Sequence, residues 1–270
     1  MKELLSIFAI SVLFLAVAAS AAIVIPLADK AKESAGVAVD KSPTINNDWV
    51  LNPHGLEKIE FIHYKKGYGK PEAAKAPKAP SCYKFLTGKV KWKTLPVNYV
   101  INPTNPQSLS ESFVCSAVIT SAETWDANTS KELFQNYDIC PINYEATYGV
   151  RDYQNAITFG DYPTEGVIAV TTVWYNPATK AIVEFDMMFD TDWRWGDADT
   201  TPTTDPEDPT AVMDLQNIAT HELGHGIGLA DVYDSACSAI TMYGYSDYEE
   251  TQKRTLEQPD VTGLQTLYGA

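Results

Sequence analysis

Short apolar runs separated by turn-forming residues dominate the chain downstream of Val90 and predict β-strands. Runs of this kind, rich in β-branched and aromatic side chains and bounded by Gly, Pro, Asn or Asp, are typical of strands buried in a sheet. They occupy residues 95–101, 156–160, 167–175 and 182–189. A similar run upstream, Ile59–Tyr64, predicts one more strand.

Two other segments place apolar residues three or four apart, which indicates helices. The first opens at Ser108–Glu111, which resembles a capping box, and continues to Trp125. The second, Val212–Thr220, leads directly into a segment that contains two histidines. Residues 195–209, between the last strand and this helix, are rich in Asp, Thr and Pro, which is typical of a surface loop.

The N-terminal region begins with a long uncharged stretch. Leu4–Leu27 carries no charged residue, and the small residues at Ala18–Ala22 suit cleavage of a secretory signal peptide. The stretch is also long enough to span a bilayer, so residues 1–27 are either a signal peptide or an N-terminal membrane anchor. Both alternatives place the rest of the chain outside the cytoplasm, either secreted or anchored on the outer cell surface.

Residues 28–80 separate this stretch from the orderly part of the chain. Residues 28–64 lack a convincing core of their own, and residues 65–80 have the Lys, Ala, Pro and Gly content of a linker. We therefore expect either a pro-segment or a stalk at 28–80, followed by one folded domain at 81–270.

Composition and charge exclude some classes of partner. The 270 residues are 45% hydrophobic, which is enough for one good-sized core plus accessory sequence. The net charge of −15, without a basic stripe, argues against nucleic acid and against anionic membrane surfaces. A solvated acidic surface accounts for this charge.

The segment His221–Asp231 carries the candidate chemistry. His221 and His225 are four residues apart, so on a helix they share a face and can direct imidazole nitrogens at one metal ion. Glu222 lies beside the first histidine, where its carboxylate can act on metal-activated water instead of binding the metal. The alternative interpretation of this bare motif is a pair of helical histidines satisfied by hydrogen bonds.

A third ligand follows the expected end of this helix. Gly228 can end the helix in a left-handed turn that brings Asp231 back toward the two histidines. Three protein ligands leave zinc one open coordination position, which distinguishes a catalytic site from a structural site with four ligands. Met242 follows soon afterwards, within Ile240–Tyr243.

Taken together, these residues resemble the metzincin clan of zinc endopeptidases and, within it, the matrixins. The clan's pattern is HExxHxxGxx, a third ligand, and then a Met-containing turn beneath the metal, on which Met242 falls. The third ligand is usually His, so Asp231 is a departure that looks like the snapalysin variant and makes the site harder and more anionic. Residues 256–269 are similar to the helix that closes matrixin catalytic domains.

The resemblance implies both a fold and an activity. It implies an α/β (α+β) catalytic domain at 81–270, with a mixed twisted sheet, a zinc helix, a Met-turn and a closing C-terminal helix. It also implies a zinc-dependent endopeptidase that acts on a protein or peptide substrate. We expect the protein to be a monomer. The metal ligands are then His221, His225 and Asp231, and Glu222 is the general base that acts on metal-activated water.

In matrixins the cleft lies between an edge strand of the sheet and the zinc helix. By analogy a substrate adds to this edge as an extended strand. The receiving residues are then Val167, Ile168, Ala169, Val170 and Thr171. Met242 is expected to pack beneath the site, and Tyr243 or Tyr245 could assist catalysis, although a core position suits each tyrosine better.

The matrixin pattern is incomplete at two further metal sites. Val170 and Met188 stand where ligands of a second, structural zinc are expected, so we predict one zinc. Asp190 and Asp192 resemble the family's calcium-binding strand end, but Trp193 stands where another carboxylate is usual. The sequence fits two alternatives at this position: a calcium site, or a plain solvated acidic turn.

The chain has four cysteines, Cys82, Cys115, Cys140 and Cys237. An even number in an exported chain predicts two disulfides, for which three pairings exist. Cys82 lies upstream of the catalytic region, where a thiolate on the zinc could impose latency. Its neighbours do not match the matrixin switch motif, and a switch would leave one cysteine unpaired, so the disulfide is favoured.

Two rival functions stay open. One is a non-catalytic surface binding module on a metalloprotease fold, against which the intact Glu222 argues, because a binding module has no use for a base. The other is an amidase with a similar zinc site; the Met-turn and the closing helix favour peptide-bond hydrolysis. The sequence identifies neither the natural substrate nor the subsite preference.

Overall fold

The computed structural model describes residues 55–69, 81–200, 203 and 208–270. The predicted signal peptide or membrane anchor, residues 28–54 and residues 70–80 of the predicted linker lie outside the described residues. Among the helices that are described, none has the length and apolar character needed to cross a membrane.

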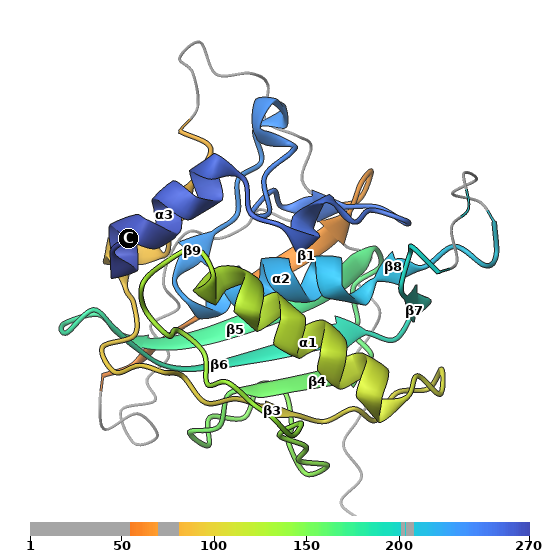
Figure 1. Ribbon diagram of the computed structural model, residues 1–270, viewed down its shortest axis with the longest axis horizontal. Coiled ribbons are helices and arrows are strands. Elements are labelled where there is room, and N and C mark those ends of the chain that lie inside the picture. The colour runs from red at the N-terminus through yellow and green to blue at the C-terminus, as the bar shows by residue number, and fades with distance from the viewer. Residues whose placement is uncertain (1–54, 70–80, 201–202, 204–207) are drawn as a thin grey trace, which may run out of the picture. The chain divides into compact units, whose positions relative to one another are not determined.

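The main element is a mixed six-stranded sheet with the strand order β10-β1-β5-β6-β4-β3 (Figure 1). Its strands are β1 (Glu57–Lys65), β3 (Val100–Ile101), β4 (Ala156–Gly160), β5 (Val167–Asn176), β6 (Ala181–Asp190) and β10 (Tyr245–Ser246). β3, β4 and β6 pair in parallel, β5 is antiparallel to both β6 and β1, and β10 is parallel to β1. The predicted mixed α/β fold is therefore confirmed.

Within the described residues, three α-helices accompany the sheet: α1 (Glu111–Asp126), α2 (Leu215–Gly226) and α3 (Gln258–Tyr268). Two short ladders pair β2 (Lys84–Phe85) with β9 (Leu229–Ala230) and β7 (Trp195–Gly196) with β8 (Met213–Asp214). Single 3₁₀ turns are η1 (Thr87–Lys89), η2 (Ser235–Cys237) and η3 (Gln252–Arg254). The predicted closing helix is thus present as α3.

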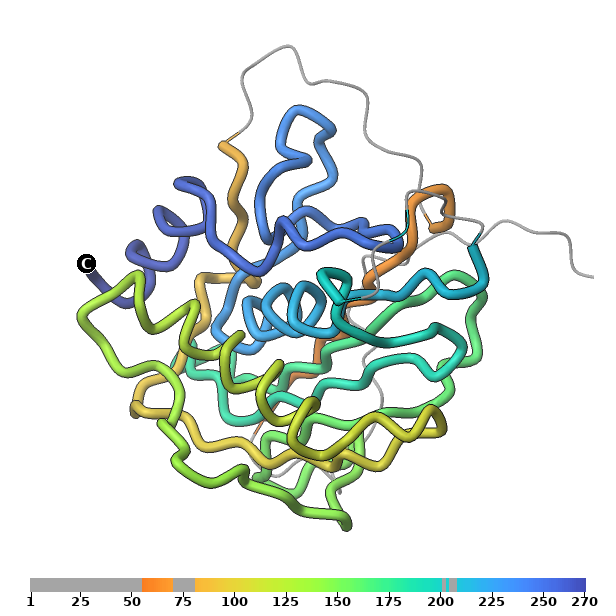
Figure 2. Tube along the Cα trace, turned by 45° about the vertical axis from the view of Figure 1, so that its right-hand side comes forward, coloured from red at the N-terminus to blue at the C-terminus, as the bar shows by residue number. Residues whose placement is uncertain are grey.

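α1 and α2 lie side by side on one face of the sheet (Figures 1 and 2). The Trp125 indole donates a hydrogen bond to the Thr220 carbonyl at 2.8 Å, which ties the two helices together. Alternate β6 residues enter the core that includes both helices, because side chains of a strand alternate between its faces. They are Phe185, Met187 and Phe189.

The opposite face of β6 carries buried carboxylates instead. Asp186 accepts hydrogen bonds from the backbone amides of Gly149 and Ala156, and Glu184 accepts from those of Asp152 and Tyr153. Burial raises the pKa of Asp186 to about 7. These carboxylates hold the loop that leads into β4 against the sheet.

The strand predicted over 95–101 is largely wrong. Only Val100 and Ile101 pair as β3, and Val97 forms an isolated bridge with Phe134. Pro96 has no amide hydrogen, so the first half of this apolar run cannot form a continuous ladder.

The start of α1 lies two residues later than predicted. Ser110, not Ser108, is the N-cap, and its hydroxyl accepts from the Phe113 amide at 3.2 Å. Ser108 has a φ of 59°, a left-handed conformation that places it in the turn before the helix.

The start of α2 is also later than the apolar periodicity indicates. The Asp214 carboxylate accepts from the Asn217 amide at 2.8 Å and so caps a helix that begins at Leu215. Met213 and Asp214 are a short strand that pairs with Trp195 and Gly196. The predicted loop at 195–209 therefore begins with paired backbone.

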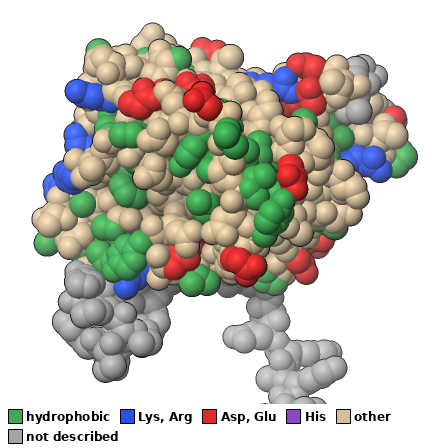
Figure 3. Space-filling view, turned by 60° about the horizontal axis from the view of Figure 1, so that its bottom comes forward, with side chains coloured by type: hydrophobic (Ala, Val, Ile, Leu, Met, Phe, Trp, Pro, Cys, Tyr) green, Lys and Arg blue, Asp and Glu red, His purple; other side chains and the backbone are tan. Residues whose placement is uncertain are grey.

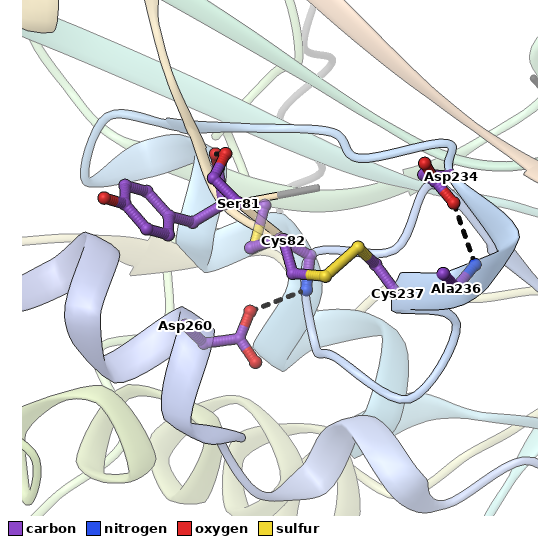
Figure 4. The surroundings of a disulfide bond; sticks show 8 residues. Ser81, Cys82, Asp234, Ala236, Cys237 and Asp260 are labelled. Atoms are coloured by element: carbon purple, nitrogen blue, oxygen red, sulfur yellow. Dashed lines mark hydrogen bonds between the residues drawn. A yellow bond between two sulfur atoms is a disulfide. The ribbon is translucent and has the colours of Figure 1, made fainter. Parts of the chain in front are cut away.

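The two disulfides select one of the three pairings. Cys115 bonds to Cys140, and Cys82 bonds to Cys237 near the start of α3 (Figure 4). The second bond joins residues 155 apart in sequence and fixes the beginning of the domain to the loop after β9. Because Cys82 is in a disulfide, it is not a thiolate switch in this structure.

Gly228 makes the turn after α2, as predicted. Its φ is 104°, a conformation that L side chains rarely adopt. A Cβ at this position would also lie 2.4 Å from the Val90 carbonyl oxygen. Because this oxygen belongs to the backbone, it cannot move aside as the end of a flexible side chain could. The turn therefore requires glycine on two independent grounds.

We expect Gly228→Ala to lower the free energy of unfolding by about 2–5 kcal/mol, from left-handed strain plus overpacking. Gly149→Ala is the matched control, because Gly149 has a φ of 78° but no atom within 4 Å of an added Cβ. It should cost only about 1–2 kcal/mol. Urea unfolding of both variants measures the difference, and equal costs would contradict the steric argument.

Candidate metal centre and active site

α2 places two imidazoles on one face and orients both through backbone carbonyls. The Nε2 atoms of His221 and His225 lie 3.2 Å apart. His221 Nδ1 lies 2.7 Å from the Thr241 carbonyl oxygen, and His225 Nδ1 lies 3.0 Å from that of Leu229. A carbonyl only accepts, so each Nδ1 carries the hydrogen and each Nε2 directs a lone pair at the other ring.

Asp231 completes this group after the turn at Gly228. Its Oδ1 lies 3.2 Å from His221 Nε2 and 3.5 Å from His225 Nε2. Its Oδ2 accepts a hydrogen bond from the Tyr233 hydroxyl at 3.0 Å. All three predicted metal ligands therefore converge, each with one atom free to face a common ion.

Zinc fits this set of donors. A tetrahedral zinc with bonds of about 2.0–2.1 Å needs ligand atoms about 3.3–3.4 Å apart. The three separations, from 3.2 to 3.5 Å, agree with that requirement. Asp231 Oδ1 has no hydrogen-bond partner although it is buried. Two nitrogen lone pairs and a carboxylate oxygen repel one another at these distances, and a cation bound between them would remove that repulsion.

The charge states of these ligands suit a metal. Burial lowers the pKa of His221 to about 4, which keeps its imidazole neutral. Burial also disfavours the charged form of His225, but the Asp231 carboxylate raises the pKa of His225 above its usual value. Burial would raise the pKa of Asp231, yet the two imidazoles hold it well below its usual value. The carboxylate is therefore ionised, and its negative charge favours a cation beside it.

Glu222 lies on the next position of α2 and is completely buried. Its Oε2 accepts a hydrogen bond from Thr171 Oγ1 at 2.6 Å, and its Oε1 lies 3.3 Å from His63 Nδ1. Burial raises the pKa of this carboxyl group to about 7. A carboxylate with a pKa near neutrality is suited to accept and return a proton.

The turn that contains Met242 lies against α2, and α3 holds it there. The Asp260 carboxylate accepts from the amides of Thr241 and Met242 at 2.8 and 3.1 Å. Figure 4 shows Asp260 beside the Cys82–Cys237 disulfide. A Cβ on Gly224 would lie 2.3 Å from the Met242 sulfur, so the bare helix backbone allows this close approach.

The segment that follows Met242 is supported by a buried lysine. Lys253 Nζ donates to the Tyr243 and Tyr245 carbonyls at 2.5 and 2.9 Å. Burial lowers the pKa of this ammonium group to about 8. Both tyrosines are buried, and the hydroxyl of a third tyrosine, Tyr233, donates to the candidate ligand Asp231.

The predicted substrate strand lies where the sequence placed it, but its outer edge is occupied. Val167, Ile168, Ala169, Val170 and Thr171 are all in β5. β1 pairs with β5 along its length, from Glu57 opposite Tyr175 to Tyr64 opposite Val167. The predicted cleft between the edge strand and α2 is therefore covered in this structure.

The predicted calcium residues lie close to a third carboxylate. Ligand atoms of Asp161, Asp190 and Asp192 lie within 4.8 Å of one another. Burial raises the pKa of Asp190 to about 6. Trp193, which stands in place of a carboxylate, turns away and donates its indole N–H to the Val167 carbonyl. Asp161 was missed because nothing local marks it as a ligand.

Val170 and Met188 pack against Val167 in a small apolar cluster. The described histidines are His63, His221 and His225, and all three are buried. No histidine is visible on the face of the molecule in Figure 3, where carboxylates are scattered among apolar groups.

The profile of the matrixin family matches residues 91–269, which include every residue of the candidate metal centre. This chain belongs to the matrixin family. Matrixins are zinc metalloendopeptidases, and the match covers the sheet strands β3 to β6, the three α-helices and the Met-containing turn.

Individual matrixins show the same relationship. Stromelysin-1 of Mus musculus is 28% identical over 193 residues, which cover 69% of this chain and 35% of that protein. Neutrophil collagenase of Homo sapiens is 26% identical over 240 residues, which cover 88% of this chain and 45% of that protein. The chain thus spans less than half the length of these relatives.

Several residues of the site lie outside the motif and could not be found from it. Tyr233 contacts a ligand, Asp260 holds the Met-containing turn, and Lys253 supports the segment after it. His63, which precedes the predicted linker, lies beside Glu222. Nothing in the sequence next to these residues marks them as part of a site.

We expect Asp231→Ala to lose tightly bound zinc and Asp231→His to retain about one equivalent per chain, because His is the clan's usual third ligand. Asp234→Ala is the matched control, since the Asp234 carboxylate only caps η2 by accepting from the Ala236 amide. Elemental analysis after dialysis measures the zinc. Full retention in Asp231→Ala would contradict the assigned ligand set.

Proposed function

We propose that this matrixin is an exported zinc-dependent endopeptidase that hydrolyses peptide bonds in proteins. The observation that carries the proposal is the position of Glu222, a buried carboxylate with a pKa near 7. It lies one residue from the first of three converging ligands on the same helix. His221, His225 and Asp231 would hold the zinc.

Zinc bound there would supply a Lewis acid that activates water and polarises the scissile carbonyl. Glu222 would accept a proton from the attacking water and pass it to the leaving amine. Thr171 donates to Glu222 Oε2 and so fixes the orientation of the carboxylate. Met242 and Gly224 keep the floor of the site packed without contributing a ligand.

The β5 edge is the proposed receiving strand for an extended peptide. Backbone hydrogen bonds to this edge give affinity, and alternate side chains give specificity. Thr171 belongs to β5 and also contacts Glu222, so a peptide on this edge would pass directly over the base. The account requires β1 to leave that edge.

We place the catalytic domain at residues 81–270 and the signal peptide or membrane anchor at 1–27, and we propose that the protein acts as a monomer. Two disulfides support export, because such bonds persist mainly in oxidising compartments. We also propose calcium at Asp161, Asp190 and Asp192, for which three converging carboxylates provide oxygen ligands.

The alternative is a non-catalytic surface module on the same fold. It offers no reason for a buried carboxylate with its own threonine donor beside the metal ligands, since burial of such a group costs stability. The two functions differ in one measurable property, which is cleavage of a protein substrate.

We expect Glu222→Ala and Glu222→Gln to bind zinc like the unaltered chain but to lose at least about 10²–10⁴-fold in casein hydrolysis, since the general base is gone. Because β1 covers the site, the assay compares the intact chain with chain cut in the 66–80 linker. A chelator should abolish the activity of the cut wild type. Retained hydrolysis in either variant would show that Glu222 is not the base.

A further inference from the structure

β1 takes the position that a bound peptide would take. It runs antiparallel to β5 in one register from Glu57 opposite Tyr175 to His63 opposite Ala169, and the register then shifts so that Tyr64 lies opposite Val167. The Lys65 amide then donates to the Gly166 carbonyl at 2.9 Å. The strand-addition edge of β5 is therefore saturated by a segment of the same chain.

The other edge of β1 faces the segment after Met242. Tyr64 and Lys65 pair in parallel with Tyr245 and Ser246 of β10. The Lys66 amide donates to the Ser246 carbonyl at 2.9 Å. β1 thus bridges the space between the edge strand and the Met-turn segment, which are the two walls of the predicted cleft.

Two β1 side chains point at the candidate active site. The Phe61 ring stacks on the His225 ring, with centroids 4.0 Å apart and planes at 6°. The His63 ring lies 4.0 Å from the His221 ring, and its Nε2 lies 3.0 Å from Ser246 Oγ. His63 Nδ1 lies 3.3 Å from Glu222 Oε1, so an imidazole occupies the space beside the proposed base.

The candidate active site beneath β1 is closed to solvent. With β1 in place, His221 and Glu222 are fully buried, His225 is 1% exposed and Asp231 is 8% exposed. A substrate cannot reach a base that has no exposed surface, and it cannot pair with a strand edge that is already paired.

We propose that Glu57–Lys65 is a built-in pseudo-substrate that closes the active site, with Phe61 and His63 as its two inward-facing contacts. The proposal rests on the endopeptidase function proposed above. It differs from a thiolate switch, since Cys82 is bonded to Cys237 and the contacting side chains are aromatic and imidazole.

β1 is held in place by backbone pairing and side-chain contacts, without a covalent cross-link. No disulfide involves it, and several of its polar contacts lie at the surface, such as Lys65–Asp247 at 3.0 Å and Tyr148 to Glu60 at 2.8 Å. A surface ion pair such as Lys65–Asp247 contributes little to stability. Hydrolysis of one peptide bond in residues 66–80 consumes one water and frees the strand. The domain after that cut remains closed by the Cys82–Cys237 bond.

The test uses the full chain with a recognition sequence for a site-specific protease inserted between Gly69 and Ser81. Two properties are measured before and after cutting: hydrolysis of a fluorogenic peptide, and the rate at which a chelator removes zinc. The same measurements are made on uncut Phe61→Ala/His63→Ala. Lys58→Ala is the matched control, because Lys58 is exposed on the opposite face of β1, over the Trp174 ring.

We expect the uncut chain and Lys58→Ala to hydrolyse slowly and to lose zinc slowly. Cutting, or the double substitution, should raise both rates at least about tenfold, since the observed rate scales with the open fraction. The cut chain carries no substitution in β1, so a folding defect in the double variant would not mask the result. Adding a synthetic peptide of residues 55–69 should restore slow hydrolysis.

Equal zinc-removal rates in the uncut, cut and doubly substituted proteins would overturn the proposal. Faster zinc removal without hydrolysis in any form would support closure by β1 and would overturn the endopeptidase function instead. The two claims are thus separable.

Discussion

Two imidazole nitrogens and one carboxylate oxygen, held within 3.5 Å of one another in a buried site, are the constraint on which the rest of this structure depends. Atoms that all carry lone pairs repel one another unless a positive charge lies among them. The fold places these three ligand atoms, and a bound metal ion would provide the positive charge. α2 sets the spacing of His221 and His225, and the glycine turn after it brings in Asp231.

Backbone groups around the site also orient the candidate metal ligands. Thr241 accepts from His221 Nδ1 through its carbonyl, while its amide donates to Asp260 of α3. A closing helix at the end of the chain therefore determines which nitrogen of a histidine on α2 faces the metal. Outer contacts of this kind fix the tautomer and orientation of metal ligands. The same turn carries Met242, whose sulfur approaches the helix at Gly224.

Much of the fold and of the site was predictable because its signals are local. Strands β4, β5 and β6 are short apolar runs bounded by turn residues, and the strand predicted at 59–64 is the centre of β1. The histidine spacing, Gly228 and Met242 follow one another along the chain. Family membership, shown by the match over 91–269, agrees with these local signals.

What could not be predicted depends on contacts between distant segments. The apolar pattern indicated that β1 is a strand but not that it pairs with β5, because the sequence of one strand does not specify which other strand it pairs with. Asp260, Lys253 and Asp161 act through backbone atoms or neighbours far along the chain. Local backbone chemistry explains the errors at 95–101 and at the start of α1, since Pro96 has no amide hydrogen to donate and Ser108 is left-handed.

X-ray absorption at the zinc edge of the zinc-loaded full chain tests the central claim most directly. The account predicts a first shell of two imidazole nitrogens and oxygen donors at about 2.0–2.2 Å, with no sulfur. In Asp231→His, which is expected to retain zinc, the first shell should gain a third imidazole nitrogen. A sulfur scatterer, or fewer than two imidazoles, would contradict the account.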